Sequence, residues 1–335
     1  KRSADLVGRY SGGAQAGHNV ALPDGRRHTF AQFGAGTLAG ASTFLGPRMI
    51  ISPATMLPEA NHMQSLGVTD PWSLLTAHPN CLVTTRYHQL MNRLRELARG
   101  DARHGSCGLG IGETRHYWLR YGRDAVFAAD LLDHRSLLAK LTLLRERFLL
   151  EMQELPHLDA GLAGLLHQAR AGEETNVLLR ASEDLAIASR MPMSDTVIFE
   201  DAQGVLLDEW YGFHPHTTWS TVTPLHALEL LADYPHAEST IIGITRAYAT
   251  RHGAGPFPTY SAAMSATLND VGNPHNDWQG EIRFGPLDLV LTEYAARATR
   301  VDGIIVNHLD ELPARPRLAT AYAGLANGGR FGPVH

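Results

Sequence analysis

The sequence predicts an α/β protein built around a mainly parallel sheet. Short apolar runs bounded by glycine or proline alternate along the chain with longer segments of helical periodicity, and this alternation is typical of strand–helix–strand units. The 335 residues are 44% hydrophobic and 19% charged, which fits a globular enzyme of one large domain or two fused ones. We see no internal repeat and no low-complexity tract.

Five apolar runs have the length and β-branched content of buried strands. They are Leu6–Tyr10, Arg48–Ile51, Thr196–Glu200, Glu238–Ile244 and Gly303–Asn307. Three segments carry apolar residues at helical spacing, namely His134–Leu155, Leu225–Ala232 and Leu289–Arg300. The first helix has Asp133 or Ser136 as a candidate N-cap and Pro156 as its stop.

Composition excludes several classes of protein. A net charge of −5 gives no electrostatic case for nucleic-acid or membrane binding. The two cysteines, Cys81 and Cys107, cannot form a disulfide framework, so we expect a reducing, cytoplasmic setting. No apolar run approaches the roughly 20 residues of a membrane span. The 18 histidines are scattered without the spacing of a zinc site.

Ligand-binding groups follow four of the predicted strands. In open α/β sheets, ligands bind beyond the carboxyl ends of strands. The segments that follow these strands are rich in glycine, amide, imidazole and carboxylate groups, and they span residues 11–19, 201–204, 250–259 and 307–310. The third, with two glycines and two prolines in ten residues, cannot be a helix and is poor strand material, so we expect a stiff loop.

Each motif also has a simpler interpretation. The glycines of Arg9–His18 can hold phosphate with bare N–H groups and His18 can donate a proton, yet a tight turn with a surface histidine is the more frequent case. The segment His104–Gly112 can hold phosphate through Ser106, but it is neither a P-loop nor a dinucleotide fingerprint. Cys107 within it is either a nucleophile or inert packing.

Three further segments suit nucleotide recognition. Gln203 places an amide at a strand end, where it suits a carbonyl or ring nitrogen. The hydroxyls of residues 212–219 suit phosphate, although an ordinary turn explains them equally well. The run Asn307–Asp310 is similar to the element with which GTPases bind guanine, with His308 in place of lysine. The alternative is that Asp310 caps a helix.

Taken in order, these segments resemble the adenylosuccinate synthetase family. Arg9–His18 reads RYSGGAQAGH and is similar to that family's RYQGGxNAGH. Phe199–Asp208 reads FEDAQGVLLD and resembles FEGAQGxLLD, and Ala247–Thr259 reads AYATRHGAGPFPT and resembles AYSTRVGAGPFPT. The resemblance runs from about Arg9 to about Tyr322.

The resemblance implies a P-loop-like nucleotide-binding fold with helical insertions and a defined reaction. GTP phosphorylates the 6-oxygen of IMP, and the aspartate amine then displaces phosphate while Mg²⁺ holds the nucleotide phosphates. It also implies a cytoplasmic homodimer that binds neither nucleic acid nor membrane. We expect a single domain over residues 1–335, and we do not find the family's N-terminal glycine-rich loop or much of its C-terminal region within these residues.

The resemblance also assigns roles to individual residues. His18 and Gln203 are the catalytic residues: His18 steadies the transferring phosphoryl group and Gln203 holds the purine. The carbonyl of Gly17 touches Mg²⁺. The residues implied in substrate binding are Gln15, Ser106, Cys107, Arg120, Gln203, Thr218, His252, Thr259 and Arg283, with Arg120 (or Arg123) reaching a partner subunit's site. Those implied in GTP binding are His308, Asp310, Gly332 and Pro333.

Departures from the family pattern keep alternatives open. Glu281 stands where an arginine would clamp the carboxylates of aspartate, which is a charge reversal. The chain could therefore use another amine, or another purine nucleotide such as dGMP, as do the short virus-encoded relatives that make 2-amino-deoxyadenylosuccinate. ATP could replace GTP. A nucleotide-binding protein without activity is the alternative from another class.

Overall fold

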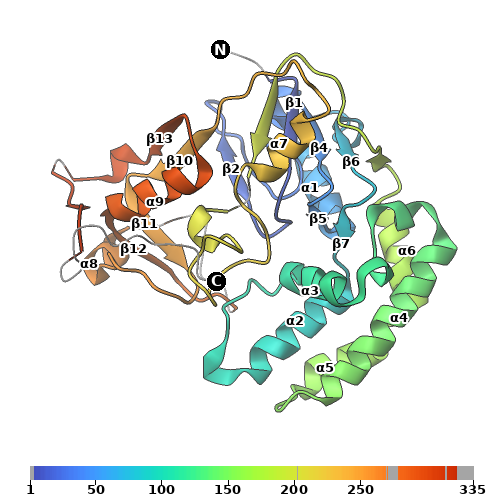
Figure 1. Cartoon of the computed structure of the whole chain (residues 1–335). Coiled ribbons are helices and arrows are strands. Elements are labelled where there is room, and N and C mark those ends of the chain that lie inside the picture. Colours follow the sequence, from blue (N-terminus) through green and yellow to red (C-terminus); the bar gives the residue numbers. More distant parts are fainter. Residues whose placement is uncertain (1–3, 202, 269, 271–277, 314, 323–335) are drawn as a thin grey trace.

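The computed structural model describes residues 4–201, 203–268, 270, 278–313 and 315–322. Its centre is a five-stranded parallel sheet with the order β8-β6-β4-β1-β9 (Figure 1). These strands are β1 (Leu6–Arg9), β4 (Ser42–Leu45), β6 (Leu75–Ala77), β8 (Ala186–Ile187) and β9 (Val197–Glu200). The α/β class and the mainly parallel sheet predicted from the sequence are confirmed.

Strand β1 lies between β4 and β9, and this position creates the site. All four of its residues are buried, as expected for a central parallel strand. The register pairs Arg9 with Glu200, so the segments that follow β1 and β9 leave the sheet side by side at its carboxyl edge. Residues 11–18 and 201–204, far apart in the sequence, therefore start from neighbouring points.

A helical insertion separates β6 from β8. It contains α2 (Arg86–Ala98), α3 (Ile111–Tyr121), α4 (His134–Gln153), α5 (Ala160–Gln168) and α6 (Ala171–Ala181), which extend away from the sheet (Figure 1). The predicted helix at His134 is confirmed, and Asp133 is its N-cap, accepting from the N–H groups of Arg135 and Ser136. Its buried face joins the main hydrophobic core, which also includes α1 (Pro53–Ser65).

The remaining strands form smaller sheets. β10 (Ile242–Arg246) pairs in parallel with β13 (Gly303–Asn307). β12 (Ile282–Asp288) pairs with β11 (Tyr248–His252) and β14 (Leu318–Ala319). β2 (His18–Ala21) and β3 (Arg27–Phe30) form a hairpin, and β5 (Ile50–Ile51) pairs with β7 (Leu82–Val83). The helices of this part are α7 (Leu225–Leu231), α8 (Ala262–Thr267) and α9 (Leu289–Thr299).

The structure corrects three of the predicted elements. The strand expected at Arg48–Ile51 contains only Ile50–Ile51, because the N–H of Met49 closes a turn onto Gly46. The strand expected at Glu238–Ile244 begins at Ile242 and pairs with β13, outside the five-stranded sheet. Residues 250–252 of the expected loop belong to β11, because the prolines lie further on and leave these N–H groups free to pair with β12. No helix of the described chain is long and apolar enough to cross a membrane.

Candidate active site at the sheet edge

His18 is held between two oxygen acceptors at the carboxyl edge of β9. Its Nδ1 lies 3.0 Å from a carboxylate oxygen of Glu200, and its Nε2 lies 2.8 Å from the main-chain oxygen of Asp201. Both ring nitrogens can donate at once only when the imidazole is protonated. Both ring nitrogens therefore face oxygen acceptors, next to the segment that carries Gln203.

Glu200 is the partner that orients His18. Burial of Glu200 would raise its pKa, but the hydrogen bond and charge of His18, the N–H of Ala35 and the charge of Arg9 lower that pKa below its usual value. Glu200 is therefore a carboxylate at neutral pH, and it accepts from Ala35 as well as from His18. A carboxylate that holds one ring nitrogen sets the direction of the other.

Arg9 fixes the loop that precedes His18. The side chain is fully buried, and its guanidinium donates to the carbonyl oxygens of Ala31 at 2.7 Å and of Ala16 at 3.3 Å. Burial lowers the pKa of Arg9, and the charges of Glu200, Glu59 and Asp201 oppose that effect. The loop is thereby tied to the end of the β2–β3 hairpin.

Two glutamine side chains in this region have unsatisfied acceptors. The Oε1 atoms of Gln15 and Gln203 are buried and have no hydrogen-bond partner in the described part of the chain. A buried acceptor without a partner costs free energy, and a ligand that donates a hydrogen bond to it would remove that cost. Both residues are among those that the sequence assigned to substrate binding.

Ser106 and Cys107 lie in a loop that α2 holds in place. Ser106 exchanges hydrogen bonds with the side-chain amide of Asn92, and the carboxylate of Glu96 accepts from the N–H groups of Gly105 and Ser106. Burial raises the pKa of the Cys107 thiol, which argues against a role for Cys107 as a nucleophile.

The glycine–proline loop after β11 is stiffened by two arginines. Arg251, with 9% of its surface exposed, donates to the carbonyl of Ala254 from Nε at 2.9 Å and from Nη2 at 2.7 Å. Arg283 donates to the carbonyls of Gly253 and Gly255. A side chain at Gly255 would collide with Arg251, because its Cβ would lie 2.2 Å from Nη2.

This loop is also packed closely against its neighbours. His252 lies with Nε2 3.0 Å from the carbonyl of Gly280. Thr259 passes so near β12 that a Cβ at Gly285 would lie 1.9 Å from the carbonyl oxygen of Thr259. On the other side a Cβ at Gly105 would lie 3.3 Å from the N–H nitrogen of Ala254, so the Ser106 loop and the glycine–proline loop are in contact.

Thr218 lies in a long loop that one buried carboxylate organises. Asp208 is fully buried and accepts from the N–H groups of Trp210, Tyr211 and Val222 at 2.7–3.0 Å. The N–H of Thr218 donates to the carbonyl of Leu207 at 2.7 Å. The loop therefore lies against the segment that follows Gln203.

His308 and Asp310 follow β13. His308 has a left-handed backbone with φ of 60°, and it precedes a short turn at Leu309–Glu311, so Asp310 lies inside the turn and is not its N-cap. The expectation that Asp310 caps a helix is therefore wrong. The Nδ1 of His308 lies 3.0 Å from the carboxylate of Glu311, which also accepts from Tyr248.

The structure groups the predicted residues unequally. His18, Gln15 and Gln203 lie beyond the carboxyl ends of β1 and β9, and Ser106, Cys107 and Thr259 belong to the contacting loops described above. His252 and Arg283 lie on β11 and β12 beside those loops. Arg120 is exposed on α3 and forms an ion pair with Glu151 at 2.8 Å. Gly332 and Pro333 lie outside the described residues.

The residues around His18 show which groups are available to bind Mg²⁺. The described chain contains no group of three or more histidine, cysteine, aspartate or glutamate side chains that could hold a metal ion. Gly17, whose carbonyl was expected to touch Mg²⁺, is solvent-exposed just before His18. Mg²⁺ takes most of its ligands from water and substrate phosphates, so a single exposed carbonyl fits as one of its few protein ligands.

Sequence reasoning missed several side chains that build the candidate site. Glu200, Arg9 and Asp208 all occur in the quoted motifs, yet none was selected as a site residue. For Glu200 the available signal was a carboxylate that ends a buried strand next to a glycine-rich loop. For Arg9 and Asp208 no local pattern distinguishes a buried charge from an exposed one.

Comparison with known proteins gives a consistent match. The family model of adenylosuccinate synthetase matches residues 1–331. The adenylosuccinate synthetase of Synechococcus sp. (strain CC9902) is 31% identical over 338 residues, which cover 98% of this chain and 75% of that protein.

Two solved structures share the fold. The fully ligated adenylosuccinate synthetase from Plasmodium falciparum superposes with a TM-score of 0.69 at 18% identity, covering 90% of this chain and 70% of that one. The succinoaminodeoxyadenylate synthetase of cyanophage S-2L, bound to dGMP and dATP, gives a TM-score of 0.56 at 16% identity, covering 91% and 76%.

Proposed function

The chain belongs to the adenylosuccinate synthetase family, and we propose that it carries out the family's reaction, a GTP-dependent ligation of IMP with aspartate, around His18 and Gln203. The observation that carries this assignment of residues is the position of His18 between Glu200 and Asp201, beside the loop of Gln203. The reaction needs a hydrogen-bond donor at a transferring phosphoryl group, and Glu200 orients the His18 ring so that Nε2 is placed to supply one.

The reaction proceeds in two stages. The γ-phosphoryl group of GTP moves to the 6-oxygen of IMP as the purine ring loses a proton. The aspartate amine then bonds to C6, and the oxygen leaves with the phosphate. Positioning and charge neutralisation supply most of the catalysis in phosphoryl transfer. His18 contributes when Nε2 leaves the carbonyl of Asp201 and donates to phosphate, while Glu200 keeps hold of Nδ1.

The amide of Gln203 orients the purine. Its buried Oε1 has no partner in the described chain, so it is suited to accept from a ring N–H of the base. Gln15, with the same feature, serves the nucleotide from the loop before His18. The Gly17 carbonyl would be one ligand of Mg²⁺ beside the nucleotide phosphates, and the ion would supply positive charge that neutralises the transferring group.

The remaining residues bind the substrates from the surrounding loops. Ser106 and Thr218 face the nucleotide phosphate, His252 and Thr259 the ribose and amino-acid side, and His308 with Asp310 the guanine. Arg120, exposed on α3, reaches a second subunit in a cytoplasmic homodimer. Glu281 is exposed at the start of β12, and Arg283 is bound to loop carbonyls, so aspartate must be held by other groups than a free arginine at this position.

The test is phosphate release by the full-length protein with Mg²⁺, GTP and IMP, with and without aspartate. We expect release that depends on aspartate and a succinylated product by mass spectrometry. Release only with another amine, with dGMP or with ATP would contradict the proposed substrates but keep the phosphoryl chemistry. No release with any of these combinations would contradict the proposal as a whole.

A further inference from the structure

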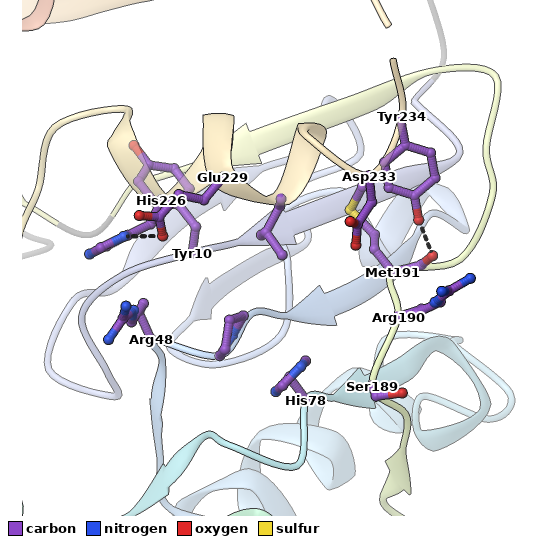
Figure 2. A pocket seen from close by; sticks show the side chains of 12 residues that line it. Tyr10, Arg48, His78, Ser189, Arg190, Met191, His226, Glu229, Asp233 and Tyr234 are labelled. Carbon is purple, nitrogen blue, oxygen red and sulfur yellow. Dashed lines mark hydrogen bonds and ion pairs between the residues drawn. The ribbon is translucent and has the colours of Figure 1, made fainter. Parts of the chain in front are cut away.

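The end of β1 has two different surroundings. Figure 2 shows the side chain of Tyr10 lining a cavity of about 200 Å³ against α7. Arg9, one residue earlier, is fully buried, and its Nη1 donates to the carbonyl oxygens of Ala31 at 2.7 Å and of Phe33 at 3.4 Å. Successive side chains along a strand point to opposite sides, which places Arg9 on the side away from this cavity.

The segment of residues 31–35 that Arg9 contacts is irregular and mostly buried, and each of its N–H groups donates to a side chain. Glu59 on α1 accepts from three consecutive N–H groups at 2.9–3.2 Å, those of Ala31, Gln32 and Phe33. The hydroxyl of Thr43 accepts from Gly34, and Glu200 accepts from Ala35. Buried N–H groups outside regular structure need such acceptors, so these three side chains fix the segment.

Glu59 is a buried carboxylate whose main partners are these N–H groups. It is 8% exposed, and the only basic group within 4 Å of its carboxylate in the described residues is His28, whose Nε2 lies 3.9 Å away. The charge of Glu59 also acts on Arg9. Burial lowers the pKa of Arg9, and the charges of Glu200 and Glu59 are the two largest effects that oppose this change.

The 31–35 segment therefore connects two carboxylates, with Arg9 bound to its carbonyl groups between them. Glu59 holds the start of the segment, and Glu200 holds its end. Glu200 also holds Nδ1 of His18, and Arg9 binds the carbonyl of Ala16, two residues before His18. A change at Glu59 thus reaches His18 by two routes, one through Arg9 and one through Glu200.

We propose that Glu59 is a positioning residue for the reaction around His18, although none of its described hydrogen bonds is to His18 itself. The proposal rests on the proposed function, in which His18 donates to the transferring phosphoryl group. Glu59 supplies a fixed charge and charge-assisted hydrogen bonds that hold the 31–35 segment. This segment keeps Arg9 and Glu200 in the arrangement that orients the His18 ring.

The test compares Glu59→Gln with the wild type in the full-length protein. Glutamine keeps the shape of the side chain but replaces the carboxylate by a neutral group with one oxygen acceptor. We expect kcat for the ligation of IMP with aspartate to fall about tenfold or more, while the KM values of GTP, IMP and aspartate change by less than about threefold. The reason is that Glu59 acts through His18 and not on the substrates.

Asp130→Asn is the matched control. Asp130 is also 8% exposed, and it accepts from the N–H of Phe127 at 2.8 Å and from the hydroxyl of Ser136, but it belongs to the helical insertion. We expect this variant to keep kcat within about twofold of the wild type, because distant sites act independently. An equal fall of kcat in the two variants would overturn the proposal, because the loss of any buried carboxylate would then be sufficient.

The ring of His18 gives a second readout that does not require turnover. NMR of the protein labelled with ¹⁵N-histidine reports the hydrogen bonds of both ring nitrogens, and the His18 signals are identified by their loss in His18→Ala. We expect Glu59→Gln to shift these signals and Asp130→Asn to leave them as in the wild type. Unchanged His18 signals in Glu59→Gln would overturn the proposal even if kcat fell, because Glu59 would then support only the fold.

The two readouts separate this proposal from the proposed function. If the wild type does not turn over GTP, IMP and aspartate, the proposed function fails, and the NMR comparison alone decides whether Glu59 positions His18. Circular dichroism checks that each variant is folded. If Glu59→Gln does not fold, Glu59→Asp, which keeps the charge on a shorter side chain, takes its place with the same expected shift and the same contradicting result.

Discussion

At the scale of single residues, the interaction between His18 and Glu200 is the feature on which the proposed activity depends. We expect His18→Ala to abolish turnover while nucleotide affinity stays within a few-fold, because the ring acts on the transferring phosphoryl group rather than on the base. Steady-state kinetics and nucleotide binding by calorimetry test this. Turnover at the wild-type rate in the variant would remove the role assigned to His18.

The lowered pKa of Glu200 makes a prediction about pH. A carboxyl group whose pKa is lower in the folded state stabilises the fold above its unfolded pKa, about 4.3, and this contribution is lost as the pH falls through the folded value. We therefore expect the free energy of unfolding of the wild type to exceed that of Glu200→Gln at pH 6. The difference shrinks as the pH falls below about 4.3.

Urea denaturation across this pH range provides the measurement. Glu229→Gln, which changes an exposed carboxylate that also lies beside a histidine, is the control and should show a smaller change with pH. A constant difference between wild type and Glu200→Gln over the whole range would contradict the prediction.

Residue-scale prediction from sequence selects residues that belong to a motif and misses residues whose surroundings are decided by burial. His18 and Gln203 occur in patterns whose glycines and spacing are informative. Glu200 was overlooked because a single carboxylate at a strand end resembles any solvated terminus. Its position beside Arg9 comes from the register between β1 and β9, which pairs residues 6–9 with residues 197–200. This register cannot be predicted from the residues that neighbour Glu200 in the sequence.

At the scale of elements, local signals predicted the helices better than the strands. The helix α4 was predictable because its apolar period, N-cap and proline stop agree with one another. Sheet membership was not predictable for β5 and β10, because strand pairing joins distant segments and depends on the whole packing. The helix α1 lacks a clean pattern, and it contains Pro58 within its span.

The loop of residues 208–222 depends on one carboxylate, and this gives a prediction. Asp208→Ala removes the shared acceptor of three N–H groups, of which that of Val222 is buried, so we expect the free energy of unfolding to fall by at least about 2 kcal/mol. Thermal or urea denaturation measures the loss. Asp133→Ala, which removes only the N-cap of α4, serves for comparison and should cost about 1 kcal/mol. Equal losses in the two variants would contradict the prediction.

At the scale of the whole molecule, the two-stranded parallel sheet of β10 and β13 is more exposed to solvent than the centre of the five-stranded sheet. β1 is buried throughout, whereas β10 and β13 expose large aliphatic side chains: Ile242 45%, Ile244 71%, Ile304 45% and Ile305 51%. Parallel strands are normally covered on both faces, and exposed apolar patches of this kind promote association. The composition of the chain gave no indication of this asymmetry.

This exposure leads to a prediction for the 335-residue chain. We expect Ile244→Thr to reduce self-association, seen as lower light scattering at high concentration, with little change in melting temperature, because 71% of this side chain is already in water. Ile50→Thr, at a residue 2% exposed, is the contrasting change and should lower the melting temperature strongly. Unchanged scattering in Ile244→Thr would show that the patch is not the contact.

The contact between Gly105 and Ala254 has a consequence for experiments on the helical insertion. Asn92 and Glu96 on α2 hold the Ser106 loop, and that loop touches the glycine–proline loop that follows β11. We therefore expect the ordering of either loop by a substrate to change the last two turns of α2 as well. Substrate binding should therefore change amide hydrogen exchange at residues 92–96, although these residues do not bind the substrate themselves. A substitution at these residues can weaken substrate affinity through the two loops without unfolding the helical insertion.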